Sequence, residues 1–109
     1  LTITSKDKDP KQVKTAAKKG VFFSARVHPG ESNASWMMKG LIDYLVCNTP
    51  EARALREKFI FKIVPMINPD GVINGNYRFN LCGSDLNRRY KAPSKVLHST
   101  VFSIKRLVK

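Results

Sequence analysis

The sequence predicts an α/β fold, built on an open mixed sheet with flanking helices, within one domain or part of one. Three observations predict this class. Apolar runs of strand length lie at 20–27 and 59–67, a long helical pattern separates them, and a turn-rich loop follows each run. In such sheets, functional loops lie beyond the carboxyl ends of the strands, so we expect a site in these two loops.

The first 19 residues are expected to lead into the domain. Residues 1–4 predict a short strand, and the lysine-rich stretch 5–19 predicts an exposed loop or insertion. The apolar run that follows is typical of a central strand covered on both faces. It consists of Val21, Phe22, Phe23, Ala25 and Val27.

The clearest helix is predicted after HPGES, residues 28–32, because apolar residues recur there with helical spacing. Ser32 or Asn33 can cap its first turn. Trp36 lies off the apolar stripe, and we assign it to packing because large aromatic side chains are usually buried. The stripe consists of Ala34, Met37, Met38, Leu41, Ile42 and Leu45.

A second, short helix is predicted to begin after Thr49 and to run to Lys58, because a proline and an acid occupy its first turn. Strand composition returns at 59–67, although Pro65 weakens the prediction because proline cannot donate to a sheet. Polar turn formers then fill 68–76 and 83–95. The last helix is predicted from an apolar face made of Leu97, Val101, Ile104 and Val108.

The charge balance is strongly basic. Lys and Arg number 20 against 8 Asp and Glu, a net charge of +12, which attracts polyanions such as nucleic acid, anionic lipid or acidic peptide tails. Nucleic acid is disfavoured because no recognisable motif interleaves basic and aromatic residues. Without a signal peptide or an apolar run near ~18 residues, we expect a soluble intracellular protein with no membrane span. Cys47 and Cys82 lack CxxC spacing and are expected to be free thiols.

The loop RVHPGES, residues 26–32, contains a candidate metal-binding pair. His28 and Glu31 lie three positions apart in a Pro-Gly turn that enters a helix, which can bring both side chains to one side. Zinc accepts both donor types, but a catalytic site needs three protein ligands and a water, so this pair alone is too few. The alternative is a turn histidine beside a glutamate favoured by the helix dipole.

The polar loops also contain a candidate anion site. Arg78, Arg88 and Arg89 lie among turn residues rather than on a helix face. An arginine can bind a carboxylate through two parallel hydrogen bonds, and the neighbouring Asn87 can add a donor. The alternative is that these are ordinary surface arginines.

Taken in order, three motifs resemble those of the M14 zinc metallocarboxypeptidases: HPGESNASWMMKG, FKIVPMINPDGVINGNYR and DLNRRY. Within that family they resemble the cytosolic carboxypeptidase branch, which trims glutamates from tubulin and other proteins. The resemblance runs from about Gly20 to about Tyr90. It implies that residues 20–109 are the N-terminal portion of a catalytic domain.

The resemblance implies a role for each candidate residue. His28 and Glu31 would bind Zn²⁺, and Arg78 would polarise the scissile carbonyl. Asn87 and Arg88 would hold the terminal carboxylate of the substrate. The family uses a further histidine ligand and a general-base glutamate downstream of DLNR. This chain lacks both, so we expect it to be inactive by itself.

Three further residues could replace the missing metal ligand, but each is expected to have another role. His98 lies where the family has no zinc ligand, and we expect it to cap the last helix or to face solvent. Asp70 and Asp85 are expected to shape turns through hydrogen bonds from their side chains to the backbone.

The resemblance therefore implies a zinc-dependent carboxypeptidase that removes C-terminal residues, glutamates from tubulin or other acidic tails. It also implies a cytoplasmic location, with association to microtubules or cilia. The alternative is a non-catalytic module that binds acidic C-terminal tails through the same arginines. We expect the partners to be polyglutamylated tubulin and similar acidic tails, with no membrane involved.

Overall fold

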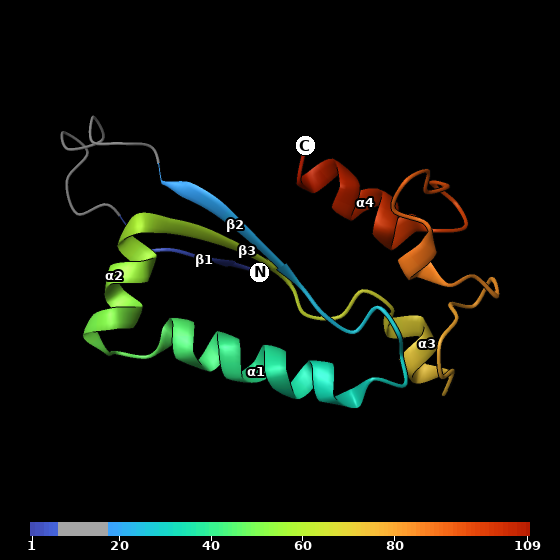
Figure 1. The fold of residues 1–109 in the computed structure, drawn as a ribbon, viewed down its shortest axis with the longest axis horizontal. Helices are drawn as coiled ribbons and strands as arrows, with labels where there is room; N and C mark the ends of the chain where they lie inside the picture. Colours follow the sequence, from blue (N-terminus) through green and yellow to red (C-terminus); the bar gives the residue numbers. More distant parts are fainter. Residues whose placement is uncertain (7–17) are drawn as a thin grey trace. The chain divides into compact units, whose positions relative to one another are not determined.

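The computed structural model describes residues 1–6 and 18–109 (Figure 1). They form two compact units: the sheet unit, Leu1–Phe23 with Lys39–Ile63, and the loop unit, Ser24–Met38 with Val64–Lys109. Mixed α/β structure with a small open sheet confirms the predicted class. The elements are β1 (Thr2–Ile3), β2 (Lys19–Ser24), α1 (Ser32–Val46), α2 (Pro50–Lys58), β3 (Phe59–Val64), α3 (Pro69–Ile73), the short 3-10 helix η2 (Leu86–Arg88) and α4 (Ser99–Leu107). Most of the predicted lysine-rich loop, residues 7–17, lies outside the described residues.

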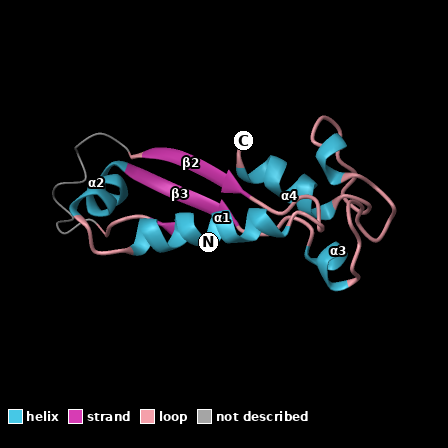
Figure 2. Ribbon diagram, turned by 60° about the horizontal axis from the view of Figure 1, so that its bottom comes forward, coloured by secondary structure: helices cyan, strands magenta, loops and turns pink. Residues whose placement is uncertain are grey.

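The described sheet has three strands in the order β1-β3-β2. β1 runs antiparallel to β3, with Thr2 opposite Lys62 and Ile3 opposite Phe61. β2 and β3 run in the same direction (Figure 2), and α1 and α2 form the crossover between them. The carboxyl ends of these two strands therefore lead into the HPGE and NPDG loops, as predicted.

β3, not β2, is the central strand of the described sheet, which corrects the prediction for 20–27. Phe61 and Ile63 on β3 are 5% and 1% exposed, whereas residues 21–23 on β2 are only half-buried. β2 ends at Ser24, so the last apolar residues of the run lie beyond it. Apolar composition indicates that strand faces are covered, but it does not reveal how many edges are paired.

α1 begins at Ser32, so neither Ser32 nor Asn33 precedes the helix as a cap. Met38 and Leu45 of the predicted stripe are buried. The assignment of Trp36 to packing is wrong, because Trp36 is 72% exposed. At 3.6 residues per turn, Trp36 is rotated by about 200° from Met38 and lies on the opposite side of the helix.

α2 runs from Pro50 to Lys58, as predicted. The Thr49 side chain accepts a hydrogen bond from Ala52 N at 3.3 Å and caps the helix. In the sheet unit, Arg56 Nη1 donates to Leu45 O at 2.6 Å, which joins α2 to the end of α1. Phe23 and Phe61 stack with centroids 6.3 Å apart.

A short helix, α3, replaces part of the loop that was predicted for 68–76. Asn68 caps it by accepting a hydrogen bond from Gly71 N at 3.0 Å, and Pro69 occupies the first helical position. Asn68, rather than Asp70, therefore makes the side-chain bond to the backbone that shapes this turn. Pro65 lies just after the last residue of β3, where a missing N–H costs the sheet nothing.

α4 confirms the last predicted helix. Its residues Val101 and Ile104 are buried, while Leu97 and Val108 lie outside the helix and are about half exposed. Cys47 and Cys82 are free, as expected. Across 1–6 and 18–109, no helix has both the length and the apolar character needed to cross a bilayer.

Candidate metal and carboxylate site

Three loops of the loop unit meet through two glycines. Gly30 N donates to Tyr77 O at 2.7 Å, and a Cβ on Gly30 would lie 2.4 Å from Tyr77 Cδ2. A Cβ on Gly71 would lie 2.5 Å from Pro29 Cγ. Contacts this short exclude any side chain, so only glycine lets the HPGE turn approach both the NPDG helix and the segment before Arg78.

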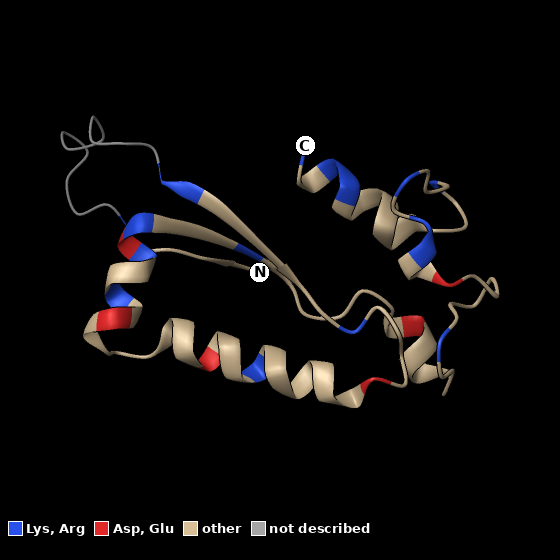
Figure 3. Ribbon diagram, in the orientation of Figure 1, with Lys and Arg blue, Asp and Glu red and all other residues tan. Residues whose placement is uncertain are grey.

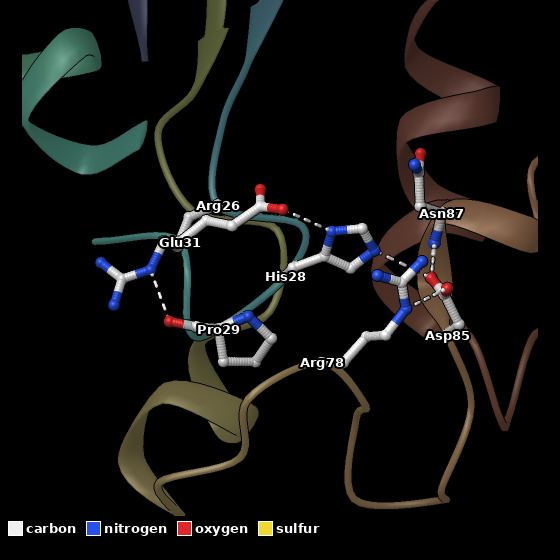
Figure 4. A network of polar contacts seen from close by, with 7 residues as sticks. All are labelled: Arg26, His28, Pro29, Glu31, Arg78, Asp85 and Asn87. Carbon is white, nitrogen blue, oxygen red and sulfur yellow. Dashed lines mark hydrogen bonds and ion pairs between the residues drawn. The ribbon is translucent and has the colours of Figure 1, made fainter. Parts of the chain in front are cut away.

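Arg26 stabilises the HPGE turn through its side chain. Its Nε donates to Pro29 O at 2.8 Å (Figure 4), and its Nη1 donates to Ser35 Oγ at 2.8 Å. Its φ of 53° is the only positive φ of a non-glycine residue in the described chain. That conformation is unfavourable for arginine, and the two side-chain bonds compensate it. Nothing in the sequence pointed to this residue, because a positive φ is signalled by residues such as glycine and asparagine and not by arginine.

The His28 ring lies between two carboxylates (Figure 4). His28 Nδ1 is 3.0 Å from Glu31 Oε1, and His28 Nε2 is 3.1 Å from Asp85 Oδ1. The ring is buried, whereas the Glu31 side chain is 51% exposed. A neutral imidazole has one N–H and can donate to only one of two ionised carboxylates.

The donor set and spacing at Nδ1 fit a zinc ion. If Nε2 donates to Asp85, the lone pair of Nδ1 faces Glu31, and a cation between them would satisfy both groups. Zinc lies about 2.0–2.1 Å from an imidazole nitrogen and about 2.0–2.2 Å from a carboxylate oxygen. Atoms that are 3.0 Å apart can therefore share one ion. A carboxylate that fixes the other ring nitrogen is the usual outer partner of a zinc-binding histidine.

Asp85 holds the centre of this network. Its Oδ2 accepts from Arg78 Nε at 2.8 Å, and its Oδ1 accepts from the backbone N–H of Asn87 at 2.9 Å as well as facing His28. Burial alone raises the pKa of the Asp85 carboxyl, but hydrogen bonds from His28, Arg78 and the Asn87 N–H outweigh burial and lower that pKa below its ordinary value. Asp85 is therefore an ionised acceptor for all three groups.

The prediction for Asp85 was correct but incomplete. The bond from Asn87 N shapes the turn at η2, as expected. The bonds to His28 and Arg78 were missed, because they join segments that are distant in the sequence. The DLNR motif itself is the signal that could have pointed to this aspartate.

The structure brings together most of the predicted site residues. His28, Glu31 and Arg78 all belong to the Asp85 network, and Asn87 joins it through its backbone N–H while its side chain extends away (Figure 4). Arg88 lies on the same turn and is exposed, with its backbone N donating to Asp85 O at 3.1 Å. Within the described ranges, no cluster of three or more His, Cys, Asp or Glu residues is arranged to hold a metal.

His98 neither faces solvent nor caps α4 with its side chain, which corrects both expectations. It is 7% exposed and occupies the N-cap position, but its side chain makes no capping bond. Its Nδ1 instead accepts from Ser94 N at 3.0 Å. The turn formed by residues 94–98 encloses the His98 ring, so the ring is buried even though His98 lies at the start of a helix.

Comparisons with known proteins identify the family of this chain. The family model described as zinc carboxypeptidase, Peptidase M14, matches residues 1–103. Human cytosolic carboxypeptidase 1 is 62% identical over 88 residues, 81% of this chain and 7% of that protein. Mouse cytosolic carboxypeptidase 2 is 51% identical over 109 residues, 100% of this chain and 12% of that protein.

A solved structure gives the same result for the fold. The metallo-carboxypeptidase from Burkholderia cenocepacia superposes with a TM-score of 0.86 at 37% identity, covering 98% of this chain and 28% of that one. The chain thus spans a small part of each of these relatives. A family model that matches nearly the whole chain, together with this identity, establishes that the chain belongs to the M14 zinc carboxypeptidase family.

Proposed function

We propose that this chain supplies part of the active site of a zinc carboxypeptidase that removes residues from acidic protein tails. One observation carries the proposal: His28 Nδ1 and Glu31 Oε1 converge to 3.0 Å while Asp85 holds the other nitrogen of the ring. If His28 only shaped the turn and Glu31 were only stabilised by the helix dipole, the buried Asp85 carboxylate at His28 Nε2 would not be needed.

In this proposal, His28 and Glu31 bind Zn²⁺ and a third ligand comes from outside the described residues. When bound, zinc polarises a carbonyl and lowers the pKa of a bound water. Arg78 is held through Nε by Asp85, so its Nη groups are oriented to donate to the oxygen that gains negative charge. Asn87 and Arg88 bind the terminal carboxylate, which restricts cleavage to chain ends.

The charge of the loop unit supports an acidic substrate. Residues 86–109 contain seven cations and no acidic residue, and Figure 3 shows blue segments around η2 and along the last turns of α4. Such a surface raises the local concentration of an acidic tail. The cations are Arg88, Arg89, Lys91, Lys95, Lys105, Arg106 and Lys109.

A related structure supports carboxylate recognition. The metallo-carboxypeptidase of Pseudomonas aeruginosa, similar with a TM-score of 0.80 at 36% identity, was solved with (2-guanidinoethylmercapto)succinic acid, a ligand with two carboxyl groups. The names of the curated relatives support a cytosolic location. We extend the proposal to glutamates of polyglutamylated tubulin and other acidic tails, with microtubules or cilia as the place of action.

The second candidate is a module that binds acidic C-terminal tails without cleaving them. The same basic surface favours it, and it needs the arginines but no metal. Glu31→Gln separates the two functions, because it removes a zinc ligand and leaves the cations intact. Under the enzyme proposal this variant loses hydrolysis, whereas a binding module keeps its affinity for the tail.

The test of the proposed carboxylate role uses the longer protein that contains this chain and two peptides ending in glutamates, one with a free C-terminus and one amidated. Arg88→Ala should lower kcat/KM on the free peptide by about tenfold or more, the cost of one lost charged hydrogen-bond pair. Lys58→Ala, at the exposed end of α2, is the matched control. An equal loss on both peptides would rule out carboxylate binding by Arg88.

A further inference from the structure

We infer that Asn80 and His98 form a latch on Ser84 that positions Asp85, and with it His28 and Arg78. Among the described residues, the side-chain hydrogen bonds of Asn80 and His98 go to groups other than His28, Glu31 and Arg78. Both act through the residue directly before Asp85, so both are positioning residues. The inference deepens the proposed function, but it concerns only hydrogen bonds within this chain.

Ser84 is held at each of its polar groups. Its backbone N–H donates to Asn80 Oδ1 at 2.9 Å, and its carbonyl accepts from Asn80 N at 3.0 Å. Its Oγ lies 3.3 Å from His98 Nε2. Three bonds on one residue leave its backbone little freedom to shift or rotate.

The tautomer of His98 follows from its partners. Ser94 N is a backbone N–H and can only donate, so His98 Nδ1 must carry a lone pair. The neutral ring then has its proton on Nε2 and donates to Ser84 Oγ. Because His98 is 7% exposed, water has little access to compete for either bond.

The latch joins the loop 80–84 to the segment 94–98. Besides binding Ser84, Asn80 donates through Nδ2 to Leu97 O at 2.9 Å and accepts from Cys82 N at 3.1 Å. The segment 94–98 leads directly into α4, which is anchored by buried side chains. These bonds tie the loop 80–84 to the segment that precedes a packed helix.

The placement of Asp85 depends on this anchor. The Asp85 carboxylate must lie within hydrogen-bond distance of Arg78 Nε, at 2.8 Å, and of His28 Nε2, at 3.1 Å, at the same time. Its short side chain cannot compensate a shift of its own backbone, and functional groups tolerate misplacements of only about 0.5 Å. Loss of the latch should therefore weaken the bonds of Asp85 before it affects the packing of α4.

Two substitutions of one residue separate the two bonds of the ring. In His98→Gln the side-chain amide reaches the position of Nε2, so the bond to Ser84 Oγ is kept and the bond from Ser94 N is lost. In His98→Asn the amide oxygen reaches the position of Nδ1, so the bond from Ser94 N is kept and the bond to Ser84 is lost. Ser84→Ala removes the same Ser84 bond without changing the ring.

The experiment measures hydrogen exchange by NMR at Arg78 Nε–H and Asn87 N–H, the two described donors besides His28 that bind the Asp85 carboxylate. We expect exchange about fivefold faster or more in His98→Asn and Ser84→Ala, and exchange within about twofold of the original chain in His98→Gln. The amide of Phe102, which donates to His98 O inside α4, reports on the fold and should be unchanged in all three.

Three results would overturn the inference. The first is unchanged exchange at both donors in His98→Asn and Ser84→Ala. The second is an equal rise in the exchange rates of the two donors in His98→Asn and His98→Gln. The third is a rise in the exchange rate of the Phe102 amide as large as that of the two donors. Either of these results would indicate a role in folding only. None of these readouts requires zinc or peptide, so the latch can fail while the proposed function stands, and the reverse also holds.

Discussion

Asp85 Oδ1 lies 3.1 Å from His28 Nε2, although the two residues are 57 positions apart in the sequence. This one contact joins the HPGE turn to the DLNR turn, and Arg78 is bound to the other oxygen of the same carboxylate. The candidate metal pair and the candidate carbonyl-polarising arginine therefore share a single anchor. Changes at that anchor should affect both at once.

Asp85→Asn should destabilise the chain by about 1–3 kcal/mol, because it replaces an ionised acceptor of charged hydrogen bonds in a site where the Asp85 side chain is only 13% exposed. Urea unfolding followed by circular dichroism measures the change. Asp70→Asn is the control, since Asp70 is exposed at the start of α3 and its loss should cost less than about 0.5 kcal/mol. Equal losses in the two variants would mean that the Asp85 network adds nothing to stability.

Gly30→Ala should destabilise by about 1–3 kcal/mol, because the new Cβ would lie 2.4 Å from Tyr77 Cδ2 and 2.9 Å from Tyr77 O. Gly40→Ala is the opposite case, because nothing lies within 4 Å of its Cβ position and it lies inside α1. There the substitution should stabilise by about 0.5–1 kcal/mol. Thermal unfolding of both variants tests the pair, and a neutral Gly30→Ala would contradict the close approach of the two loops.

Cys47 should react with alkylating reagents faster than an ordinary thiol. The pKa of the Cys47 thiol is lowered mainly by a hydrogen bond with the Thr49 side chain and, to a smaller extent, by one with the Thr49 backbone. Since the thiolate is the reactive form, a lower pKa increases its fraction at any pH below the ordinary value. The rate of iodoacetamide labelling against pH, measured in a Cys82→Ser background, should shift to higher pH in Thr49→Val and stay in place in Thr49→Ser. A shift that is the same in both variants would exclude the hydroxyl as the cause.

The chain of residues 1–109 should bind zinc weakly, with a Kd above about 1 µM by calorimetry, because two protein ligands are fewer than a catalytic zinc site uses. What binding there is should disappear in His28→Ala. Affinity tighter than this limit, or zinc binding that survives the loss of His28, would show that a residue other than His28 and Glu31 binds the metal.

Much of the fold was predictable because it depends on local patterns. The helical stripe around Met38, the cap at Thr49 and the apolar run at 59–67 each specify an element within a few residues. The edge position of β2 was not predictable, because strand order depends on pairing between distant segments. The exposure of Trp36 was open to prediction, since its position relative to the stripe already placed it on the other side of α1.

The candidate site divides in the same way. His28 and Glu31 were found because their spacing lies within a single turn, and the arginines were found because they lie in a polar loop. Asp85 was assigned only to its own turn, and His98 was expected to cap the last helix or to face solvent. The partners that were missed come from other segments of the loop unit: His28 and Arg78 for Asp85, and Ser84 for His98. No spacing within a motif reveals such contacts.

The number of positions that separate two bonded residues predicts the order in which the bonds of this site form during folding. Arg26 to Pro29 and His28 to Glu31 each span three positions, and Arg26 to Ser35 spans nine. Short loops close at a smaller entropic cost and faster than long ones. The HPGE turn should therefore form early in folding, and the contact between Asp85 and His28 should form in a later step. Pulsed hydrogen exchange during refolding would show this as protection of Ala34 N–H before Asn87 N–H.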